Sequence, residues 1–327
     1  MQGLDKVILA AGHPHFFHRA SVWVARKQGF FAEEGIDNYE ILATGKDEKT
    51  LEGVIKGSIH VGLDIRPAIV LRENNKGADV YVIGAFINGF PFTLIGDKTI
   101  KSAGELKGKR IEVVGSGGGI DERQIRAYLR KNKLDPDRDV LWVRDAPFPN
   151  IAKVMERIEK GEIQARAVWT EDAPLAQRQG YTMLCDFFAE YYPEGYLQRA
   201  IVTSGKMINE HPDILKAVLK VIIRGFRFLR TEENYAEANK IVDISTTEEG
   251  LGWEEMDYSK IERQYLGYKI LPRDGNITKV GFQQMIEEEI AEGKLPESYR
   301  MDQVVRLNLV EAAARELDAK YGPEGYR

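Results

Sequence analysis

A chain of 327 residues with 43% hydrophobic side chains is long enough to bury one large core or two cores of medium size. Its net charge of −5 is not gathered into blocks of like charge, which argues against nucleic acid as a partner. No apolar run reaches the roughly 18–20 residues of a membrane span, and a single cysteine, Cys185, excludes internal disulfides and a cysteine-based zinc site.

The start of the sequence bears on where the protein works. Strand-forming residues begin within a few positions of Met1, and no basic segment, apolar segment or lipobox precedes them. We therefore expect a cytoplasmic protein as the sequence stands, and a periplasmic or extracellular one if an export signal has been removed.

The first ninety residues alternate between strand and helix patterns, which is typical of βαβ units with a largely parallel sheet and helices on both faces. Gly35 and Gly57 supply stops for two of the helices, and Asp64 is a candidate cap for the helix that Pro67 begins. The expected strands are Val7–Ala11, Tyr39–Ala43, Ile59–Leu63 and Val80–Phe86, and the expected helices are Ser21–Glu34, Asp47–Lys56 and Pro67–Asn75.

A second alternating stretch begins at Phe92. Ser102 is expected to cap a short helix that ends at Gly108. The chain is expected to return to the first lobe around Arg199–Ser204, and helices are expected from Pro212 onward. The expected strands of this stretch are Phe92–Gly96, Lys109–Val114, Val140–Val143 and Ala165–Trp169, and the expected helices are Ile120–Lys131 and Ile151–Lys160.

Three segments carry a resemblance to a known family. Ala25–Ile36 is a helix that runs into Gly-Phe-Phe-Ala-Glu-Glu-Gly-Ile, Ile100–Ile111 reads S-x-x-E-L-K-G-K-x-I after a strand, and His211-Pro212 precedes a long helix. In these features, and over roughly residues 5 to 240, the chain resembles the solute-binding proteins of ABC transporters for sulfonates, nitrate and thiamine-pyrimidine precursors.

The resemblance implies an α/β, type II periplasmic-binding-protein-like fold with two Rossmann-like lobes and a helical C-terminal region. Residues 1–93 with 201–327 would form lobe one and residues 94–200 lobe two, joined by two crossings that act as a hinge. Such a protein holds a small anion in the cleft between its lobes, here an aromatic, sulfonate-type or carboxylate-type molecule. It needs no cofactor and would deliver its ligand to an ABC permease.

A glycine-rich loop, Gly115-Ser116-Gly117-Gly118-Gly119, joins a predicted strand to a predicted helix. Glycines let backbone N–H groups approach a ligand, and the helix N-terminus adds partial positive charge, so the loop is a candidate anion site. Ile120 excludes a dinucleotide-binding G-x-G-x-x-G, and no Lys-Ser/Thr follows for a phosphate-binding loop. Arg123, one turn into the helix, could assist. A tight turn without a ligand stays the alternative.

Further candidates lie at the expected carboxyl ends of strands, where open α/β sheets bind ligands. His13 and His15 imitate the H-x-H of metal-dependent amidohydrolases, but the other histidines do not supply a plausible remaining ligand set, so no metal is expected. Arg66 could hold an anionic group bidentately, and Trp169 could stack on the ligand. Loop contacts, surface exposure and core packing remain the alternative roles for these side chains.

His60 stands where the resembling proteins commonly carry aspartate. It could be a core histidine or a titrating group in the cleft. A weaker likeness to the hydroxybiphenyl sulfinate desulfinases, which share this scaffold, rests on His60. The nucleophilic cysteine of that family is missing here, because His13 stands before Pro14, and Arg66 does not fit its R-x-G-G motif. The alternative to a binding protein is therefore a cofactor-independent decarboxylase or desulfinase-like lyase or hydrolase that uses His60 and His13.

Overall fold

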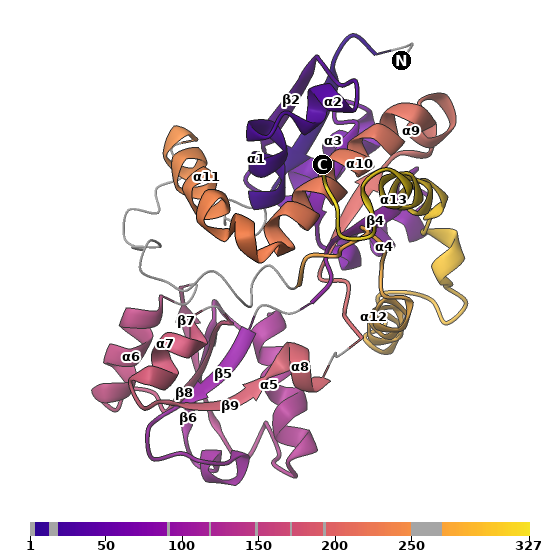
Figure 1. Ribbon diagram of the computed structural model, residues 1–327. Coiled ribbons are helices and arrows are strands. Elements are labelled where there is room, and N and C mark those ends of the chain that lie inside the picture. Colours follow the sequence, from indigo (N-terminus) through magenta and orange to yellow (C-terminus); the bar gives the residue numbers. More distant parts are fainter. Residues whose placement is uncertain are drawn as a thin grey trace. The chain divides into compact units, whose positions relative to one another are not determined.

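The computed structural model describes residues 4–12, 19–89, 92–117, 119–147, 150–170, 172–191, 194–249 and 270–327. These residues divide into two compact units. Unit 1 holds residues 4–12, 19–89, 194–249 and 270–327, and unit 2 holds the described residues between 92 and 191. Each unit contains a five-stranded sheet with helices packed on it (Figure 1). The α/β class with two Rossmann-like lobes is therefore confirmed.

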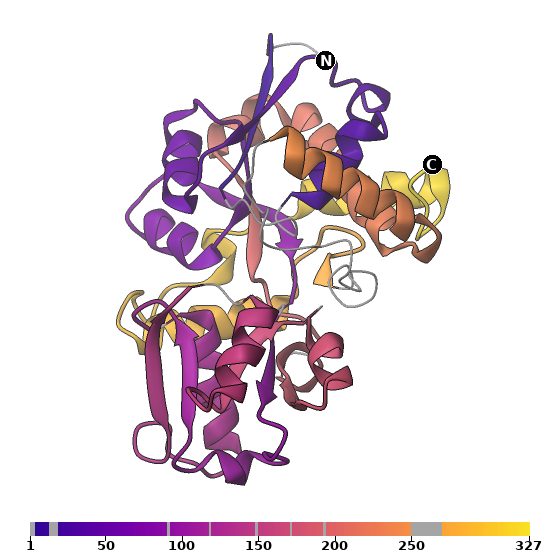
Figure 2. The same ribbon diagram turned by 90° about the vertical axis from the view of Figure 1, so that its left-hand side faces the viewer.

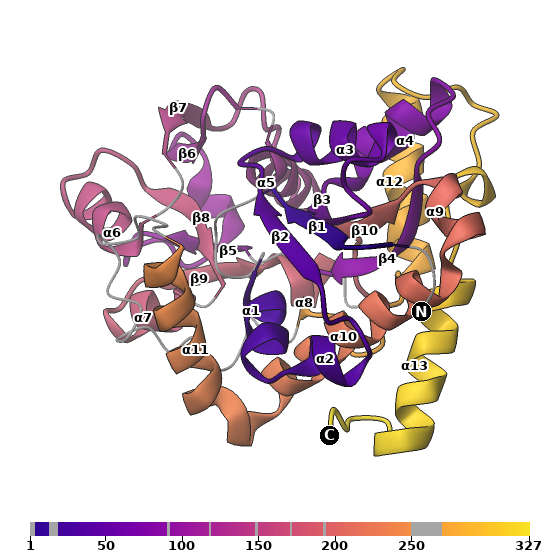
Figure 3. The same cartoon turned by 90° about the horizontal axis from the view of Figure 1, so that it is seen from above.

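Unit 1 is built on a sheet with the strand order β2-β1-β3-β10-β4. Helices α3 and α4 lie on one side of this sheet, and α1, α2 and α10 lie on the other (Figures 2 and 3). The strands are β1 (Val7–Ala11), β2 (Tyr39–Ala43), β3 (Val61–Ile65), β4 (Tyr81–Ile87) and β10 (Arg199–Thr203). The helices are α1 (Ala20–Lys27), α2 (Phe30–Glu33), α3 (Asp47–Lys56), α4 (Pro67–Asn75), α9 (Gly205–Glu210), α10 (Pro212–Arg230), α11 (Tyr235–Glu248), α12 (Lys279–Ala291) and α13 (Asn308–Tyr321).

Helix α10 forms the centre of the packing on its side of unit 1. Its apolar side chains are buried almost along the whole helix, and it contacts α1, α2 and α13. Two arginines of α10 are also fully buried, and they bind the end of the chain: Arg224 Nε donates to the carbonyl of Tyr326 (2.8 Å), and Arg227 Nη1 donates to that of Gly325 (2.9 Å). The half-buried C-terminal residues are thus held against unit 1 by buried side chains.

Unit 2 is built on a sheet with the strand order β7-β6-β8-β5-β9. Ile151, Val154 and Ile158 of one helix join Ala173 and Ala176 of another in a buried cluster on one face of this sheet. The strands are β5 (Phe92–Gly96), β6 (Arg110–Val114), β7 (Leu141–Ala146), β8 (Ala165–Trp169) and β9 (Thr182–Asp186). The helices are α5 (Ile120–Lys131), α6 (Ile151–Glu159), α7 (Ala173–Arg178) and α8 (Phe187–Tyr191), with a 3₁₀ turn at Ala103–Leu106.

One strand in each sheet runs against the other four. β5 pairs antiparallel with β8 and β9, and β10 pairs antiparallel with β3 and β4. These two are the strands in which the chain enters unit 2 and re-enters unit 1. Because β10 is reversed, its first residue lies at the same edge of the sheet as the ends of β3 and β4.

The predicted elements differ from the structure in a few places. The helix expected over Ser21–Glu34 is wrong as a single element: it is α1 and α2, because Gly29 adopts φ +77° between them. Asp64 lies inside β3 and does not cap α4, whose N-cap is Arg66. The short helix after Ser102 is a 3₁₀ turn, and the predicted cap is confirmed as a capping box with Glu105. In the part of the chain with a described structure, no helix has both the length and the apolar character needed to cross a bilayer.

Candidate functional site

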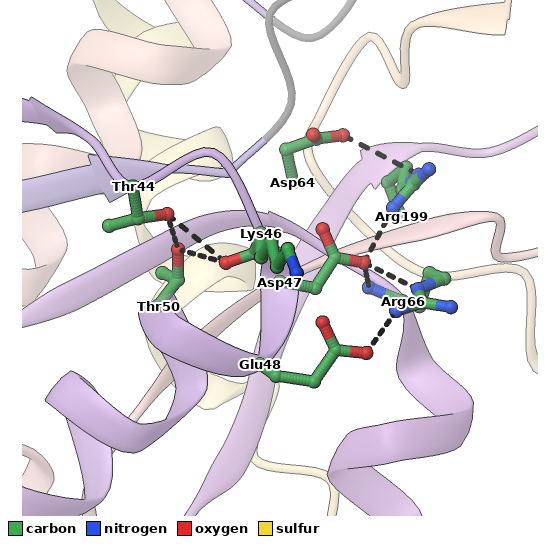
Figure 4. Close-up of polar contacts among 8 residues, drawn as sticks. All are labelled: Thr44, Lys46, Asp47, Glu48, Thr50, Asp64, Arg66 and Arg199. Atoms are coloured by element: carbon green, nitrogen blue, oxygen red, sulfur yellow. Dashed lines mark hydrogen bonds and ion pairs between the residues drawn. The ribbon is translucent and has the colours of Figure 1, made fainter.

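Charged side chains meet at the carboxyl edge of the unit 1 sheet, and we call this set the edge cluster: Asp47, Glu48, Asp64, Arg66 and Arg199 (Figure 4). They come from the first turn of α3, the end of β3, the residue before α4 and the start of β10. Ligands of open α/β sheets bind outside the carboxyl ends of strands. The edge cluster is therefore the candidate site of unit 1.

Asp47 holds the edge cluster together through one carboxylate oxygen. Its Oδ2 accepts hydrogen bonds from Arg66 Nε (2.6 Å), the Arg66 backbone N–H (3.3 Å) and Arg199 Nη1 (2.8 Å). Only 6% of the Asp47 side chain is exposed, while Arg66 is half exposed and also binds Glu48. The contact between Asp47 and Arg199 closes a loop of 152 positions, so tertiary folding alone creates it.

The two arginines set the protonation of the cluster. Burial by itself would raise the pKa of Asp47, but the positive charge of Arg199 and the hydrogen bonds and charge of Arg66 lower it below its usual value. Burial opposes the charged form of Arg66, yet its bonds and charge interactions with Asp47 and Glu48 raise its pKa. Asp47 is therefore an ionised carboxylate, and the arginines are fixed in place by it.

One N–H donor of Arg199 has no hydrogen-bond acceptor among the described residues. Its Nε lies 3.7 Å from Asp64 Oδ1, too far for a hydrogen bond, and this buried nitrogen has no hydrogen-bond partner among the described residues. Asp64 itself is fully buried with φ +63°, at the point where the pairing of β3 and β10 shifts register. A buried donor without an acceptor is costly to the fold, and strained backbone of this kind gathers at functional sites.

The glycine-rich loop of unit 2 is closed by its own neighbours. Gly117 has φ +92°, and a Cβ there would collide with Arg144, whose Nη1 donates to the carbonyl of Ser116 (2.9 Å). Gly119 caps α5, and two carboxylates occupy the first turn of that helix: Asp121 accepts from the Val114 N–H (2.8 Å), and Glu122 binds Arg144. Burial raises the pKa of Asp121. Anion binding by this loop stays a prediction, and the two acidic side chains oppose it.

Two other predicted residues of unit 2 lie on described elements, one buried and one exposed. Trp169 ends β8, is 5% exposed, and stacks on Phe92 with ring centroids 4.6 Å apart. Arg123 is exposed on α5. Three of the predicted site residues, His13, His15 and Gly118, lie outside the described residues.

His60 lies at the opposite edge of the unit 1 sheet from the edge cluster. It precedes β3, its Nδ1 accepts from the Ile8 N–H (3.0 Å), and its carbonyl accepts from the Thr203 hydroxyl (2.6 Å). Burial, and then the nearby His211, lower the pKa of His60. These contacts tie β1, β3 and β10 together with a neutral imidazole, so they favour the structural role that the sequence left open.

A surface groove of about 450 Å³ between α3 and α4 offers less to a ligand. Charged side chains that line it are paired within the fold, as in Glu52 with Lys56 and Glu73 with Lys76. The groove is lined by Glu48, Leu51, Glu52, Ile55, Lys56, Ile69, Arg72, Glu73 and Lys76.

Of the edge cluster, sequence reasoning identified only Arg66 as a ligand residue and missed Asp47 and Arg199. A weak signal existed for Arg199, since a charged residue opens an otherwise apolar strand, Ala200–Thr203. Nothing local marked Asp47, because an acidic residue in the first turn of a helix is common for electrostatic reasons alone.

A family comparison agrees with the architecture. The family model described as NMT1/THI5 like matches residues 17–234. The chain belongs to this family. Among named relatives, YtlA of Bacillus subtilis (strain 168) is 22% identical over 303 residues, which cover 85% of this chain and 86% of YtlA. The bicarbonate transport ATP-binding protein CmpC of Synechococcus elongatus is 22% identical over 264 residues, covering 73% of this chain but only 38% of CmpC.

Solved structures with the same fold include binding proteins and an enzyme. The periplasmic aliphatic sulphonate binding protein SsuA from Escherichia coli superimposes with a TM-score of 0.67 at 15% identity, covering 93% of this chain and 92% of SsuA. The desulfurization enzyme DszB gives a TM-score of 0.63 at 13% identity, covering 96% of this chain and 99% of DszB. Both likenesses show the fold alone, and with it the predicted periplasmic-binding-protein-like scaffold is confirmed.

Proposed function

We propose that this protein binds a small anion at the edge cluster and serves as the solute-binding component of an ABC-type import system. The observation that carries the proposal is Arg199: its Nε is buried without a hydrogen-bond acceptor in the described chain, at the carboxyl edge of the sheet. A carboxylate or sulfonate oxygen would supply that acceptor.

The geometry around Arg199 suits such a ligand. Asp47 Oδ2 binds an N–H group at the edge of each guanidinium group. Little side-chain freedom therefore remains to be lost when a ligand binds. Arg66 is half exposed and can offer its outer N–H groups beside Arg199. Guanidinium groups match planar acidic groups bidentately.

The comparisons support the same role at a coarser level. The sulphonate-binding protein SsuA and the bicarbonate transport protein CmpC associate related chains with small anions and their transport. An ABC permease is accordingly the proposed partner. The enzymatic alternative is the weaker one, because it depended on His60, whose Nδ1 accepts a backbone hydrogen bond at the other edge of the sheet.

Isothermal titration with a panel of small carboxylates and sulfonates tests the proposal. We expect at least one anion to bind wild-type protein, and the Arg199→Gln variant to lose that binding. Arg315→Gln is the matched control, since Arg315 is exposed on α13 in the same unit. Unchanged affinity in Arg199→Gln, with wild-type circular dichroism, would remove the edge cluster from the site.

A further inference from the structure

Carboxylates outnumber guanidinium groups among the five side chains that define the edge cluster. Of its described side chains, three are carboxylates (Asp47, Glu48 and Asp64) and two are guanidinium groups (Arg66 and Arg199), which gives a net charge of −1 when all five are ionised. A simple anion would therefore meet the buried carboxylates of Asp47 and Asp64, with the exposed Glu48 beside them. Like charges at short range repel strongly when water is excluded.

One oxygen of Asp47 is not used within the cluster. All three donors from Arg66 and Arg199 bind Oδ2, and Oδ1 accepts no hydrogen bond from the described residues. Oδ1 faces Gly12, at the end of β1: a Cβ on Gly12 would lie 3.1 Å from Oδ1 and 3.0 Å from the Asp47 backbone nitrogen. A side chain at position 12 would cover this oxygen, and glycine leaves it open.

We propose that the ligand is a zwitterion, in which an ammonium group lies beside the acidic group. The ammonium donates to Asp47 Oδ1, and the acidic group binds Arg199 and Arg66. Such a ligand satisfies the buried donor of Arg199 and adds no net charge to the cluster. The inference rests on the proposed function, since it names the ligand class for the same site.

Matched probes that differ only in the ammonium group test the inference on wild-type protein. The pairs are 2-aminoethanesulfonate with ethanesulfonate and 3-aminopropanoate with propanoate, with ethylamine as the amine alone, all measured by isothermal titration. We expect at least one zwitterion to bind ten times or more tighter than its deaminated partner, and ethylamine not to bind. Equal or weaker binding of both zwitterions, with the simple anions bound, overturns the zwitterion and leaves the anion-binding function standing. Failure of the zwitterions and the simple anions alike, or equal binding of ethylamine, overturns the proposed function as well.

A variant pair assigns the preference to Asp47. Asp47→Asn keeps the size of the side chain and removes its charge, so the ratio of affinities within a pair is expected to fall to near one. Glu52→Gln is the matched control, because Glu52 is an exposed carboxylate of the same helix whose partner is Lys56. If Asp47→Asn folds and keeps the wild-type ratio, Asp47 does not bind the ammonium group; if it does not fold, the comparison on wild type still decides the ligand class.

Discussion

The carboxyl edges of the two sheets use charge in different ways. In unit 1, Asp47 gathers Arg66 and Arg199 but leaves a buried Arg199 nitrogen and one of its own oxygens without partners among the described residues. In unit 2, Arg144 and Glu122 bind each other, and Arg144 also binds the backbone of Ser116, so the glycine-rich loop is locked in place. The two sheets have a similar strand order. The charge cluster at the carboxyl edge of the unit 1 sheet keeps atoms without partners among the described residues, whereas Arg144 and Glu122 in unit 2 are paired with each other.

This difference shows why a glycine-rich loop alone is weak evidence for an anion site. The backbone of such a loop can bind an arginine from the next strand as well as a ligand. A carboxylate in the first helical turn can also interact with the positive end of the helix dipole in place of a bound anion. An unsatisfied buried donor at the carboxyl edge of a sheet is better evidence, because native folds leave few buried donors without a partner and ligands of open α/β sheets bind at that edge.

Unit 2 also holds buried polar groups without hydrogen-bond partners among the described residues, and one of them, Asp172, gives the largest expected effect. Asp172 is 1% exposed, neither of its oxygens has a hydrogen-bond partner among the described residues, and burial raises its pKa to about 7. The folded state thus holds a proton that the unfolded state releases near pH 4, so stability is lost as the pH rises toward 7. We expect Asp172→Asn to stabilise the protein, by up to about 4 kcal/mol at pH 8.

Denaturant unfolding at pH 5 and pH 8 measures this effect. The advantage of Asp172→Asn over wild type should be larger at pH 8, because the asparagine does not ionise. Asp145→Asn is the control, being an exposed aspartate of the same unit. A destabilised Asp172→Asn at pH 8 would mean that the Asp172 carboxylate has hydrogen-bond partners in solution. The exception that Asp172 makes in unit 2 would then be removed.

The locked loop predicts the next largest effect. Gly117→Ala places a Cβ at φ +92° and against Arg144, so it should destabilise the protein by about 1–3 kcal/mol through strain and loss of the Arg144–Glu122 pair. Gly180→Ala, at φ +89° and with only Lys98 near the new Cβ, controls for the backbone strain alone. Equal destabilisation of the two variants would show that Arg144 does not hold the loop.

The open cluster of unit 1 predicts an effect on affinity. Arg199→Lys keeps the charge but removes Nε and the planar fork, so we expect the best-binding anion to bind roughly 10- to 100-fold more weakly, which is the usual range for a charge-assisted hydrogen bond. The stability of the apo protein should change much less than the affinity. Wild-type affinity in this variant would mean that the unsatisfied nitrogen is not where the ligand binds.

His60 predicts the smallest effect, at the edge of unit 1 away from the cluster. Because its pKa is lowered in the folded state, the stability it contributes is complete above about pH 6.5 and is lost as the pH falls below that value. His60→Gln should remove this part of the pH dependence at a cost of about 1 kcal/mol, with ligand affinity unchanged. A loss of ligand affinity in His60→Gln, or turnover of a bound ligand detected by mass spectrometry in the wild type alone, would revive the enzymatic alternative.

The sequence by itself determined the elements and the family. Strand and helix periodicities, together with stops such as Gly57 and caps such as Ser102, are properties of neighbouring residues, and α3, α4, α5 and β8 have the predicted bounds. The break at Gly29 was missed, because a glycine between two helical patterns does not show from sequence whether it adopts a positive φ. The edge strand β9 was missed as well.

Only the tertiary structure decided which charged residues act together. The reversed β10 carries Arg199 to Asp47 across 152 positions, and the register shift opposite Asp64 sets the distance that leaves Nε without an acceptor among the described residues. Arg144 reaches the glycine loop from a strand that follows it by some thirty residues, and the Ile8 N–H binds Nδ1 of His60 at the edge of the sheet away from the cluster. Contacts of this kind depend on strand order and register, which long-range packing fixes and local sequence does not encode.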